Sequence, residues 1–418
     1  MPPAPSATTP HDRAPEPGER APLRVLHAPA AVGGHPQGLA RAERALGLDS
    51  RSLVYEASPF GYEADEVVLG LMPSLADRAR LEAFRFRLLR RVLTDDFDVV
   101  HFNFGQSLFP RPIVPGSPAV AGFPGPLQQV YRGWSALLGM RDLAVLRRRG
   151  VAVFVTFQGD DVRQADVCRA RDEWSPARES EPSAVEHGMD EVRRTVARRF
   201  DRWADGIYFL NPDLARVLPP RARFVPYAHV SPEHWLPVPH PPNPRPLVVH
   251  APTARAITGT HHLLAALDAL RVEGVEFDLE LVEGRTQAEA RQIYARADLV
   301  IDQLMLGWYG GLAVECMALG VPVIAHIRTA DLDRVPRAFG DELPIIDATP
   351  ATIRDVLRTW LVARRPELPE AGRRGRAFVE RWHDPLRVAA PVVEDYRAAV
   401  ARHSREGFGS VLRGAWRG

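Results

Sequence analysis

Apolar residues in this chain gather in short runs, and longer stretches with a helical spacing of apolar positions separate these runs. In the first part of the chain the runs lie at 23–27, 52–56, 97–103, 151–157, 206–210 and 223–228. Helical spacing fills much of the sequence between them, as at 75–94 and 184–204. Strands that are apolar throughout are buried on both faces. The alternation therefore predicts an α/β fold with a parallel sheet that helices cover on both sides.

The same alternation begins again after residues 236–246, LPVPHPPNPRP, whose six prolines predict a stiff linker. Later apolar runs lie at 246–250, 277–283, 297–302, 321–326 and 343–347. The pattern predicts two α/β domains, 23–235 and 247–385, and a helix at 386–404 that could cross back to the first domain. Residues 1–22, rich in Pro and Ala, are expected to form a disordered extension, and 405–418 a tail.

The amino-acid composition excludes several classes of function. Hydrophobic residues make up 45% and charged residues 25% of the 418 positions, and the net charge of +1 gives no reason to expect nucleic acid as a partner. All 53 basic residues are Arg, so Schiff-base chemistry and the P-loop lysine are excluded. Only Cys168 and Cys316 occur, and no apolar run approaches the roughly 20 residues of a membrane span. A cytoplasmic enzyme is expected.

Residues 307–326, GWYGGLAVECMALGVPVIAH, are the most informative segment. Positions 312–319 are apolar except Glu315, which predicts an interior helix with a buried carboxylate. Such a carboxylate needs a protein partner or the hydroxyls of a ligand. Gly310 and Gly311 would let an anion approach the free N–H groups at the helix start. Together they predict a sugar-nucleotide site, although Glu315 could instead cap or ion-pair within the domain.

This segment resembles the donor-site signature of retaining glycosyltransferases of the GT-B fold, especially family 4 (glycosyl transferases group 1). That family shows Glu, seven residues, Glu, and then an Ala-x-Gly-x-Pro-Val run. Here Glu315 is the second Glu and ALGVPV follows, while Gly307 stands at the first Glu. The resemblance implies two Rossmann-like domains that face each other across a cleft. It also implies that Glu315 grips the ribose of a nucleotide diphosphate sugar and that position 307 lies near the donor sugar.

Two glycine-containing loops extend the resemblance. Residues 250–260, HAPTARAITGT, follow the first strand of the second domain, where the family has an Arg and a Lys that clamp the diphosphate. Arg255 matches the Arg, and Thr258 stands at the Lys position and could donate one hydrogen bond. Gly33 and Gly34 resemble the glycine pair that faces the donor phosphate and the acceptor. The alternative for Arg255 is a solvated loop arginine, and the alternative for Gly33 and Gly34 is an ordinary turn.

Residues 156–163, TFQGDDVR, resemble the family's Thr-x-His-Gly-x-Asp pattern. Gln158 replaces the His, so acid–base help from an imidazole is excluded there. Asp161 aligns with the Asp of the pattern and is expected to bind acceptor hydroxyls. N-capping of the next segment by Asp161 is the alternative.

Glu283 ends an apolar run of the second domain and is followed by Gly284 and Arg285. A carboxylate at the carboxyl end of a strand could meet the base or a ribose of the nucleotide. It could equally cap a helix that begins near Thr286.

Asp96-Phe97-Asp98 spells the Asp-x-Asp of metal-dependent glycosyltransferases, but it leads into an apolar strand and is interpreted as loop and strand edge. No His, Cys or Asp spacing predicts a metal site, and no cofactor besides the donor is expected. Residues 104–134 interleave aromatic side chains with Arg. This stretch could shape an acceptor pocket, make peripheral membrane contact, or pack as a buried helix.

The resemblance implies a metal-independent glycosyltransferase that moves a sugar from a nucleotide diphosphate to an acceptor hydroxyl with retention. No protein base is needed in that reaction, because the leaving phosphate takes the acceptor proton. The departures at Gly307, Thr258 and Gln158 leave a second hypothesis open, a non-catalytic GT-B protein that binds a sugar nucleotide or partners an active enzyme. A sugar-nucleotide epimerase of the same fold would need further acid–base side chains in the cleft.

Overall fold

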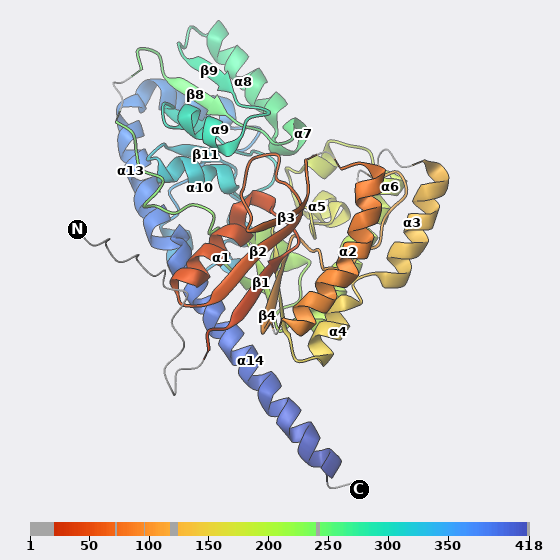
Figure 1. Ribbon diagram of the computed structural model, residues 1–418. Helices are drawn as coiled ribbons and strands as arrows, with labels where there is room; N and C mark the ends of the chain where they lie inside the picture. Colours follow the sequence, from red (N-terminus) through yellow and green to blue (C-terminus); the bar gives the residue numbers. More distant parts are fainter. Residues whose placement is uncertain (1–20, 72, 96, 118–123, 240–242, 416–418) are drawn as a thin grey trace, which may run out of the picture.

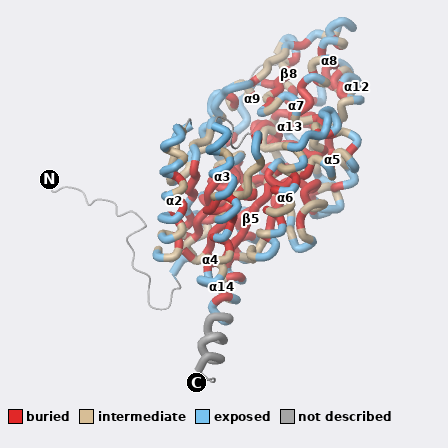
Figure 2. Tube along the Cα trace, turned by 90° about the vertical axis from the view of Figure 1, so that its right-hand side faces the viewer, coloured by how far each residue is buried: buried red, intermediate tan, exposed pale blue. Residues whose placement is uncertain are grey.

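The protein was studied as a computed structural model, which describes residues 21–71, 73–95, 97–117, 124–239 and 243–415, with side chains up to 405. Figure 1 shows two α/β halves, the second stacked above the first. Figure 2 shows that buried residues run through the interior of the body, while exposed residues lie on its outer helices. The predicted extension at 1–22 lies outside the described residues except for its last two positions, and Asp96 lies outside them as well.

The first half is built on a seven-stranded parallel sheet with the strand order β3-β2-β1-β4-β5-β6-β7. This confirms the predicted parallel sheet. Edge strand β3 was not predicted, because its side chains are only half-buried or exposed and carry no strong apolar pattern. The strands are β1 (Arg24–Ala28), β2 (Asp49–Glu56), β3 (Glu66–Leu69), β4 (Val99–Asn103), β5 (Ala152–Phe157), β6 (Gly206–Phe209) and β7 (Arg223–Phe224).

Helices cover both faces of this sheet, and side-chain caps begin two of them. Ser74 and Asp77 form a capping box at the start of α2, and Ser183 accepts from the N–H of Glu186 at the start of α6. These bonds satisfy N–H groups that have no partner within the helix. The helices are α1 (His35–Ala45), α2 (Leu75–Thr94), α3 (Gly125–Leu138), α4 (Asp142–Arg148), α5 (Ala165–Arg171) and α6 (Ala184–Trp203).

The second half repeats this construction around a five-stranded parallel sheet with the order β12-β11-β10-β8-β9. Its strands are β8 (Leu247–His250), β9 (Asp278–Leu281), β10 (Leu299–Ile301), β11 (Val323–Ala325) and β12 (Ile346–Asp347). Its helices are α7 (Arg255–Thr258), α8 (Thr260–Val272), α9 (Gln287–Tyr294), α10 (Gly311–Ala318), α11 (Arg337–Asp341), α12 (Ile353–Arg358) and α13 (Leu368–Phe378).

Helix α14 (Pro385–Ala415) leaves the second half and packs against α1 and β5 of the first. Figure 1 shows it running along the first half and projecting beyond it. The tail predicted from residue 405 therefore begins inside a helix that continues to Ala415. Among the described residues, no helix combines the length and the apolar character needed to cross a membrane.

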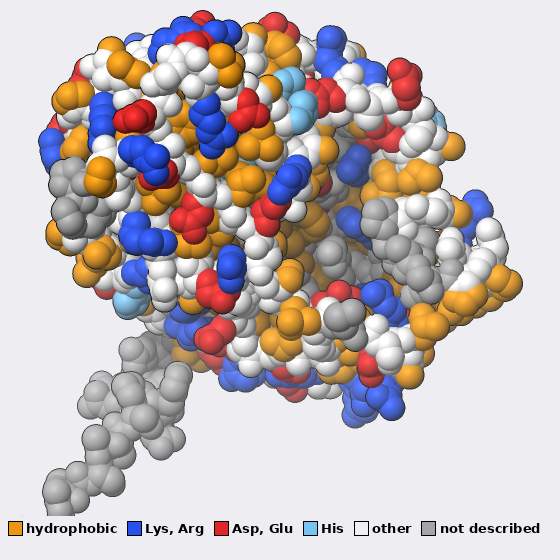
Figure 3. Space-filling model, turned by 90° about the horizontal axis from the view of Figure 1, so that it is seen from above, with side chains coloured by type: hydrophobic (Ala, Val, Ile, Leu, Met, Phe, Trp, Pro, Cys, Tyr) orange, Lys and Arg blue, Asp and Glu red, His pale blue; other side chains and the backbone are white. Residues whose placement is uncertain are grey.

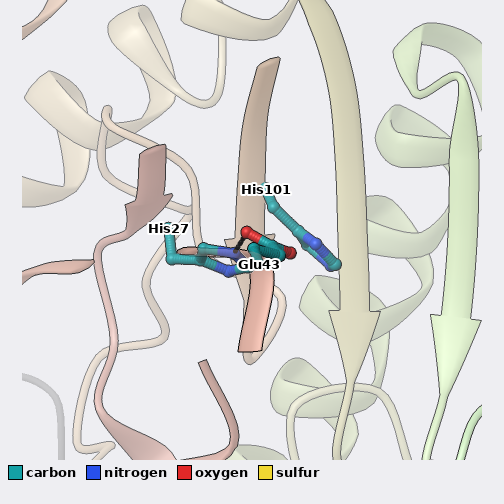
Figure 4. Close-up of side chains that lie close together, drawn as sticks. All are labelled: His27, Glu43 and His101. Atoms are coloured by element: carbon teal, nitrogen blue, oxygen red, sulfur yellow. Dashed lines mark hydrogen bonds and ion pairs between the residues drawn. The ribbon is translucent and has the colours of Figure 1, made fainter. Parts of the chain in front are cut away.

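A buried polar network ties α14 to the first sheet. His27, Glu43 and His101 lie together in the interior, as Figure 4 shows. Glu43 accepts hydrogen bonds on Oε2 from Ser50 (2.6 Å) and on Oε1 from the Tyr396 hydroxyl of α14 (3.0 Å), and His27 Nε2 lies 2.8 Å from Oε2. The same hydroxyl meets Nδ1 of His101. Burial holds the pKa of His101 well below its usual range, so this ring stays neutral.

We expect Tyr396→Phe to destabilise the protein by about 1–3 kcal/mol, because it leaves a buried carboxylate oxygen and a buried imidazole nitrogen without a partner. Denaturant unfolding at constant m-value measures the change. The matched control is Tyr294→Phe, a tyrosine that is 5% exposed and whose hydroxyl makes no hydrogen bond within the described residues. Equal stability of the two variants would contradict a structural role for the network.

Candidate functional site

Loops at the carboxyl ends of the two parallel sheets meet between the halves. Gly33 and Gly34 follow β1, and Gln158 follows β5. A Cβ atom on Gly33 would lie 3.8 Å from Oε1 of Gln158, so two of the predicted segments are neighbours. In the other half, Arg255 follows β8 and Gly310 begins α10 after β10. The carboxyl ends of parallel strands are the usual place for ligands in such sheets.

Glu315 lies on α10 at this junction and is 5% exposed. Its Oε1 accepts hydrogen bonds from Gln287 Nε2 (2.5 Å) and from the hydroxyl of Tyr62 (3.3 Å), a residue of the first half. Burial raises the pKa of Glu315 to about 7, and these two hydrogen bonds act in the opposite direction. The predicted buried carboxylate is therefore present, and two neutral donors bond to its Oε1.

His229 packs beside this carboxylate, with Nε2 3.6 Å from Oε1 of Glu315. Burial lowers the pKa of His229 to about 3, so the ring is neutral and the contact is not an ion pair. Neither ring nitrogen makes a hydrogen bond within the described residues, and Nε2 of Gln158 also lacks one. Buried polar atoms without partners are rare in folded proteins and cost about 1–3 kcal/mol each. Sequence reasoning missed His229, which has no local motif around it.

Tyr62 occupies the space between the glycine pair and Glu315. It belongs to the loop between β2 and β3, and a Cβ atom on Gly34 would lie 2.6 Å from its ring. The same loop is bound to the second half, because the Gln287 N–H donates to the Phe60 carbonyl (2.9 Å). Gly34 has a φ of 66°, which favours glycine independently of this contact. A ligand that joins the glycine pair to Glu315 must therefore displace Tyr62.

The N–H groups at the start of α10 were expected to be free for an anion, but one of them is already bonded. The N–H of Gly310 donates to Oδ2 of Asp302 (2.5 Å), and a Cβ atom on Gly311 would lie 3.3 Å from the His229 ring. Asp302 follows β10 directly and is 6% exposed, and burial raises its pKa to about 6. The protein's own carboxylate thus stands at the predicted anion site, and only the later N–H groups of the first turn remain for a ligand.

Arg255 is also engaged by a neighbour. Its guanidinium donates two hydrogen bonds to Glu283 (2.8 and 2.5 Å), and both side chains are exposed. These bonds hold the pKa of Glu283 below its usual range. The capping alternative for Glu283 is wrong, because Thr286 and Glu289 form the capping box of α9. Thr258 is buried and its Oγ1 donates to the Ala254 carbonyl (3.2 Å).

Asp161 holds the loop after β5 rather than facing a pocket. Its carboxylate accepts from the N–H groups of Gln158 (3.1 Å) and Gly159 (2.7 Å), and it is 1% exposed. Burial raises its pKa to about 6. The exposed neighbour Asp160 pairs with Arg163 and lines a cavity between the halves. The observed contacts of Asp161 are those of a turn, and the binding of acceptor hydroxyls by this residue stays a prediction.

A guanidinium lies beside Gly307. A Cβ atom there would lie 2.7 Å from Cζ of Arg328. Arg328 pairs with Asp172 of the first half (3.2 Å) and with Asp331 (3.1 Å). Arg216 of the first half pairs with the same two carboxylates. All four side chains are at most 16% exposed, so a buried ion cluster joins the two halves at this end of the cleft.

Two neighbouring cavities lie in the first half, and the first of them is beside Gly33. The first, of about 340 Å³, is lined by residues that include Ala31, Gly33 and Gln106. The second, of about 380 Å³, lies between α2 and α3, has a mainly apolar lining, and shares Glu56, Leu81 and Arg85 with the first. In the predicted aromatic stretch, Tyr131 and Trp134 both donate to Glu82 at this second cavity (2.9 and 2.7 Å). The space-filling view shows a hollowed surface with charges of both signs around it (Figure 3).

Comparison with known proteins identifies the fold. No protein-family model and no curated protein matches the sequence. Sucrose-phosphate synthase from Thermosynechococcus elongatus is similar in structure, with a TM-score of 0.56, 15% identity, and coverage of 91% of this chain and 100% of that one. HepE from Anabaena in complex with UDP-glucose gives a TM-score of 0.55, 11% identity, and coverage of 90% and 99%. The catalytic domain of starch synthase IV from Arabidopsis thaliana, bound to ADP and acarbose, gives a TM-score of 0.52 and 11% identity, and the match covers 91% of this chain and 100% of that one. The GT-B fold predicted for this chain is thereby confirmed.

We expect Gly34→Ala to displace Tyr62 from Glu315, because the new methyl group would overlap the tyrosine ring. Hydrogen exchange of residues 57–65 should rise as the loop detaches. The control is Gly47→Ala, which has a similar positive φ of 87° but no atom within 4 Å of the added Cβ. Unchanged exchange in Gly34→Ala would show that Tyr62 is not held by the glycine pair.

Proposed function

We propose that the protein is a glycosyltransferase that moves a sugar from a nucleotide diphosphate sugar to an acceptor hydroxyl. The observation that carries this proposal is the buried pair of Glu315 and His229, where both nitrogens of His229 lack partners within the described residues. Nε2 of the half-buried Gln158, which lies beside Gly33, also lacks one. A sugar nucleotide is rich in hydroxyl and phosphate oxygens, which are the partners these atoms need. The GT-B fold and the position of the group between the halves agree with this function.

In the proposed complex Glu315 binds the ribose. Its present donors, Gln287 and Tyr62, are neutral, and ribose hydroxyls would supply bonds of the same kind. The loop that carries Tyr62 withdraws when the nucleotide enters. The exchange replaces one neutral donor by others, so the buried carboxylate is never left without hydrogen bonds.

The diphosphate is proposed to lie against Arg255 and the first-turn N–H groups of α10 that follow Gly310. Arg255 exchanges Glu283 for phosphate oxygens, which a guanidinium can bind with two parallel hydrogen bonds. Both side chains are exposed, so the pair they now form is weak and readily exchanged. The proposed transfer is metal-independent and retaining, as in family 4, with the departing phosphate accepting the proton of the acceptor.

The acceptor is proposed to enter through the cavity beside Gly33. Its neighbour between α2 and α3 has exposed apolar side chains at the rim, including Leu75, Leu127 and Val130. An acceptor with an apolar part, presented in solution or at a membrane surface, would bury these side chains. A cytoplasmic location belongs to the same proposal, and Cys168 and Cys316 are both buried and unpaired.

A second function is favoured by the contacts that side chains of the site make with one another. Tyr62, Glu283 and Asp302 each occupy a position that a donor would take, and Thr258 brings no charge. A non-catalytic GT-B protein that binds a sugar nucleotide, or that partners an active glycosyltransferase, is consistent with these contacts. Donor hydrolysis assayed with a panel of nucleotide sugars separates the two functions, since only the enzyme turns donors over.

We expect nucleotide diphosphate affinity to fall as the pH drops below about 7, because protonation of Glu315 removes a charged acceptor for the ribose hydroxyls. Titration calorimetry with UDP and ADP between pH 6.5 and 8.5 measures this. Glu315→Gln should weaken binding by about 1–3 kcal/mol at high pH and should show only the pH dependence of the ligand. A folded variant with unchanged affinity would exclude the ribose assignment.

We expect Arg255→Ala to lower donor turnover by roughly 100-fold, because negative charge develops on the leaving diphosphate. Glu283→Gln should instead tighten nucleotide diphosphate binding, since it removes a competing carboxylate from Arg255. The neighbouring exposed Arg285 supplies the control, Arg285→Ala, which should change neither quantity. A robust transferase that is indifferent to Arg255→Ala would place the phosphate clamp elsewhere.

A further inference from the structure

A carboxylate and two imidazoles converge from opposite halves of the molecule, away from the proposed donor site. Glu179 follows a short helical turn of the first half, and His261 and His262 lie in the first turn of α8 in the second. Nε2 of His262 is 2.6 Å from Oε1 of Glu179, and Nε2 of His261 is 3.3 Å from Oε2. One ligand atom from each residue lies within 4.8 Å of the other two.

We propose that Glu179, His261 and His262 bind a divalent transition metal ion, with Zn²⁺ the best match, and so link the two halves. Two imidazoles and one carboxylate are a common donor set for zinc, with bonds of about 2.0–2.2 Å and a position left for water. Ligand atoms around such an ion stand roughly 3–3.5 Å apart, a spacing that small rotations of these side chains provide. The exposed fractions of 32%, 56% and 25% leave a path for a hydrated ion.

The arrangement of the two rings supports a metal in preference to a simple hydrogen-bonded group. The ring centroids of His261 and His262 are 4.0 Å apart, and both Nε2 atoms face one carboxylate. Two protonated imidazoles this close would repel each other, whereas two neutral ones can share a dication. Trp174 packs edge-on against His262, with centroids 6.1 Å apart, and helps to fix the orientation of that ring.

The buried group of His27, Glu43 and His101 is a weaker candidate, although its atoms are equally close. His101 uses both nitrogens, toward Tyr396 and toward Thr156 Oγ1 (2.8 Å), and Glu43 has partners on both oxygens. Nδ1 of His27 lacks a partner within the described residues, but these side chains are at most 1% exposed, and an ion would have to displace the hydrogen bonds that Glu43 and His101 already make. That group is a polar part of the core.

A metal bound by Glu179, His261 and His262 would hold the two halves together at one edge of the cleft between them. Ala177 and Ser180, which flank Glu179, line a cavity of about 260 Å³, and Ile257 and Met305 of the second half line its other side. An ion shared by Glu179 and the two histidines would hold this rim closed. It would also stabilise the described arrangement by an amount that grows with the logarithm of its concentration above Kd, because it binds only when the halves are together.

The test is titration of the full-length chain with ZnCl₂ in a calorimeter, and with CoCl₂ followed by visible absorption, both without any nucleotide. We expect a single Zn²⁺ site whose affinity falls by at least about 10-fold in Glu179→Gln, His261→Ala and His262→Ala. We also expect tetrahedral Co²⁺ bands that these variants lose. Because no donor is present, the outcome is independent of whether the protein is a transferase.

Two controls keep the result decisive. His187→Ala removes an exposed histidine of α6 outside the site and should leave Zn²⁺ affinity unchanged. His101→Gln should likewise leave it unchanged if the buried group holds no ion. No Zn²⁺ binding to the wild-type chain, or binding that survives His262→Ala in a folded variant, would overturn the proposal. Binding lost only in His101→Gln would do so as well.

Discussion

The buried ion cluster of Arg216, Asp172, Arg328 and Asp331 fixes how the two halves meet. Each half contributes one arginine and one aspartate, and each of the four charges pairs once within its own half and once with the other half. Removing one member of such a group leaves a buried charge without compensation, which costs about 3–5 kcal/mol. The contact of Tyr62 with Glu315 depends on the same relative position, because its two residues come from different halves.

In this arrangement most charged groups of the cleft are paired within the protein. Arg255 has Glu283, and the N–H of Gly310 has Asp302. Ligand binding is therefore an exchange of partners, and its free energy is the difference between two sets of similar bonds. His229 and Gln158 are different, because their unpaired nitrogens gain partners without losing any. Specific affinity for a nucleotide sugar would then come chiefly from these neutral groups, with the charged pairs contributing orientation.

Local pattern was enough to predict both sheets, apart from edge strand β3, and the burial of Glu315. Fully apolar strands and an apolar helix with one carboxylate are signals that a short window of sequence contains. Tyr62 and His229 could not be predicted, because their importance comes from contacts across the cleft, and Tyr62 and Glu315 are 253 positions apart. For Asp161 the sequence could not choose between two roles. Its residue type suits both ligand binding and turn formation, and the structure shows the hydrogen bonds from the N–H groups of Gln158 and Gly159 that belong to the turn.

Gly307, which stands where the resembled signature has a glutamate, lies against the guanidinium of Arg328. Any side chain at position 307 would begin within 3 Å of the guanidinium, and the φ of 70° there also favours glycine. A glutamate at 307 would have to push Arg328 away from Asp172 and Asp331 and so disrupt the ion cluster that joins the halves. The position of the Arg328 guanidinium therefore depends on the absence of a side chain at position 307. Position 307, where the signature that this sequence resembles has a glutamate, thus lies beside a guanidinium shared between two aspartates.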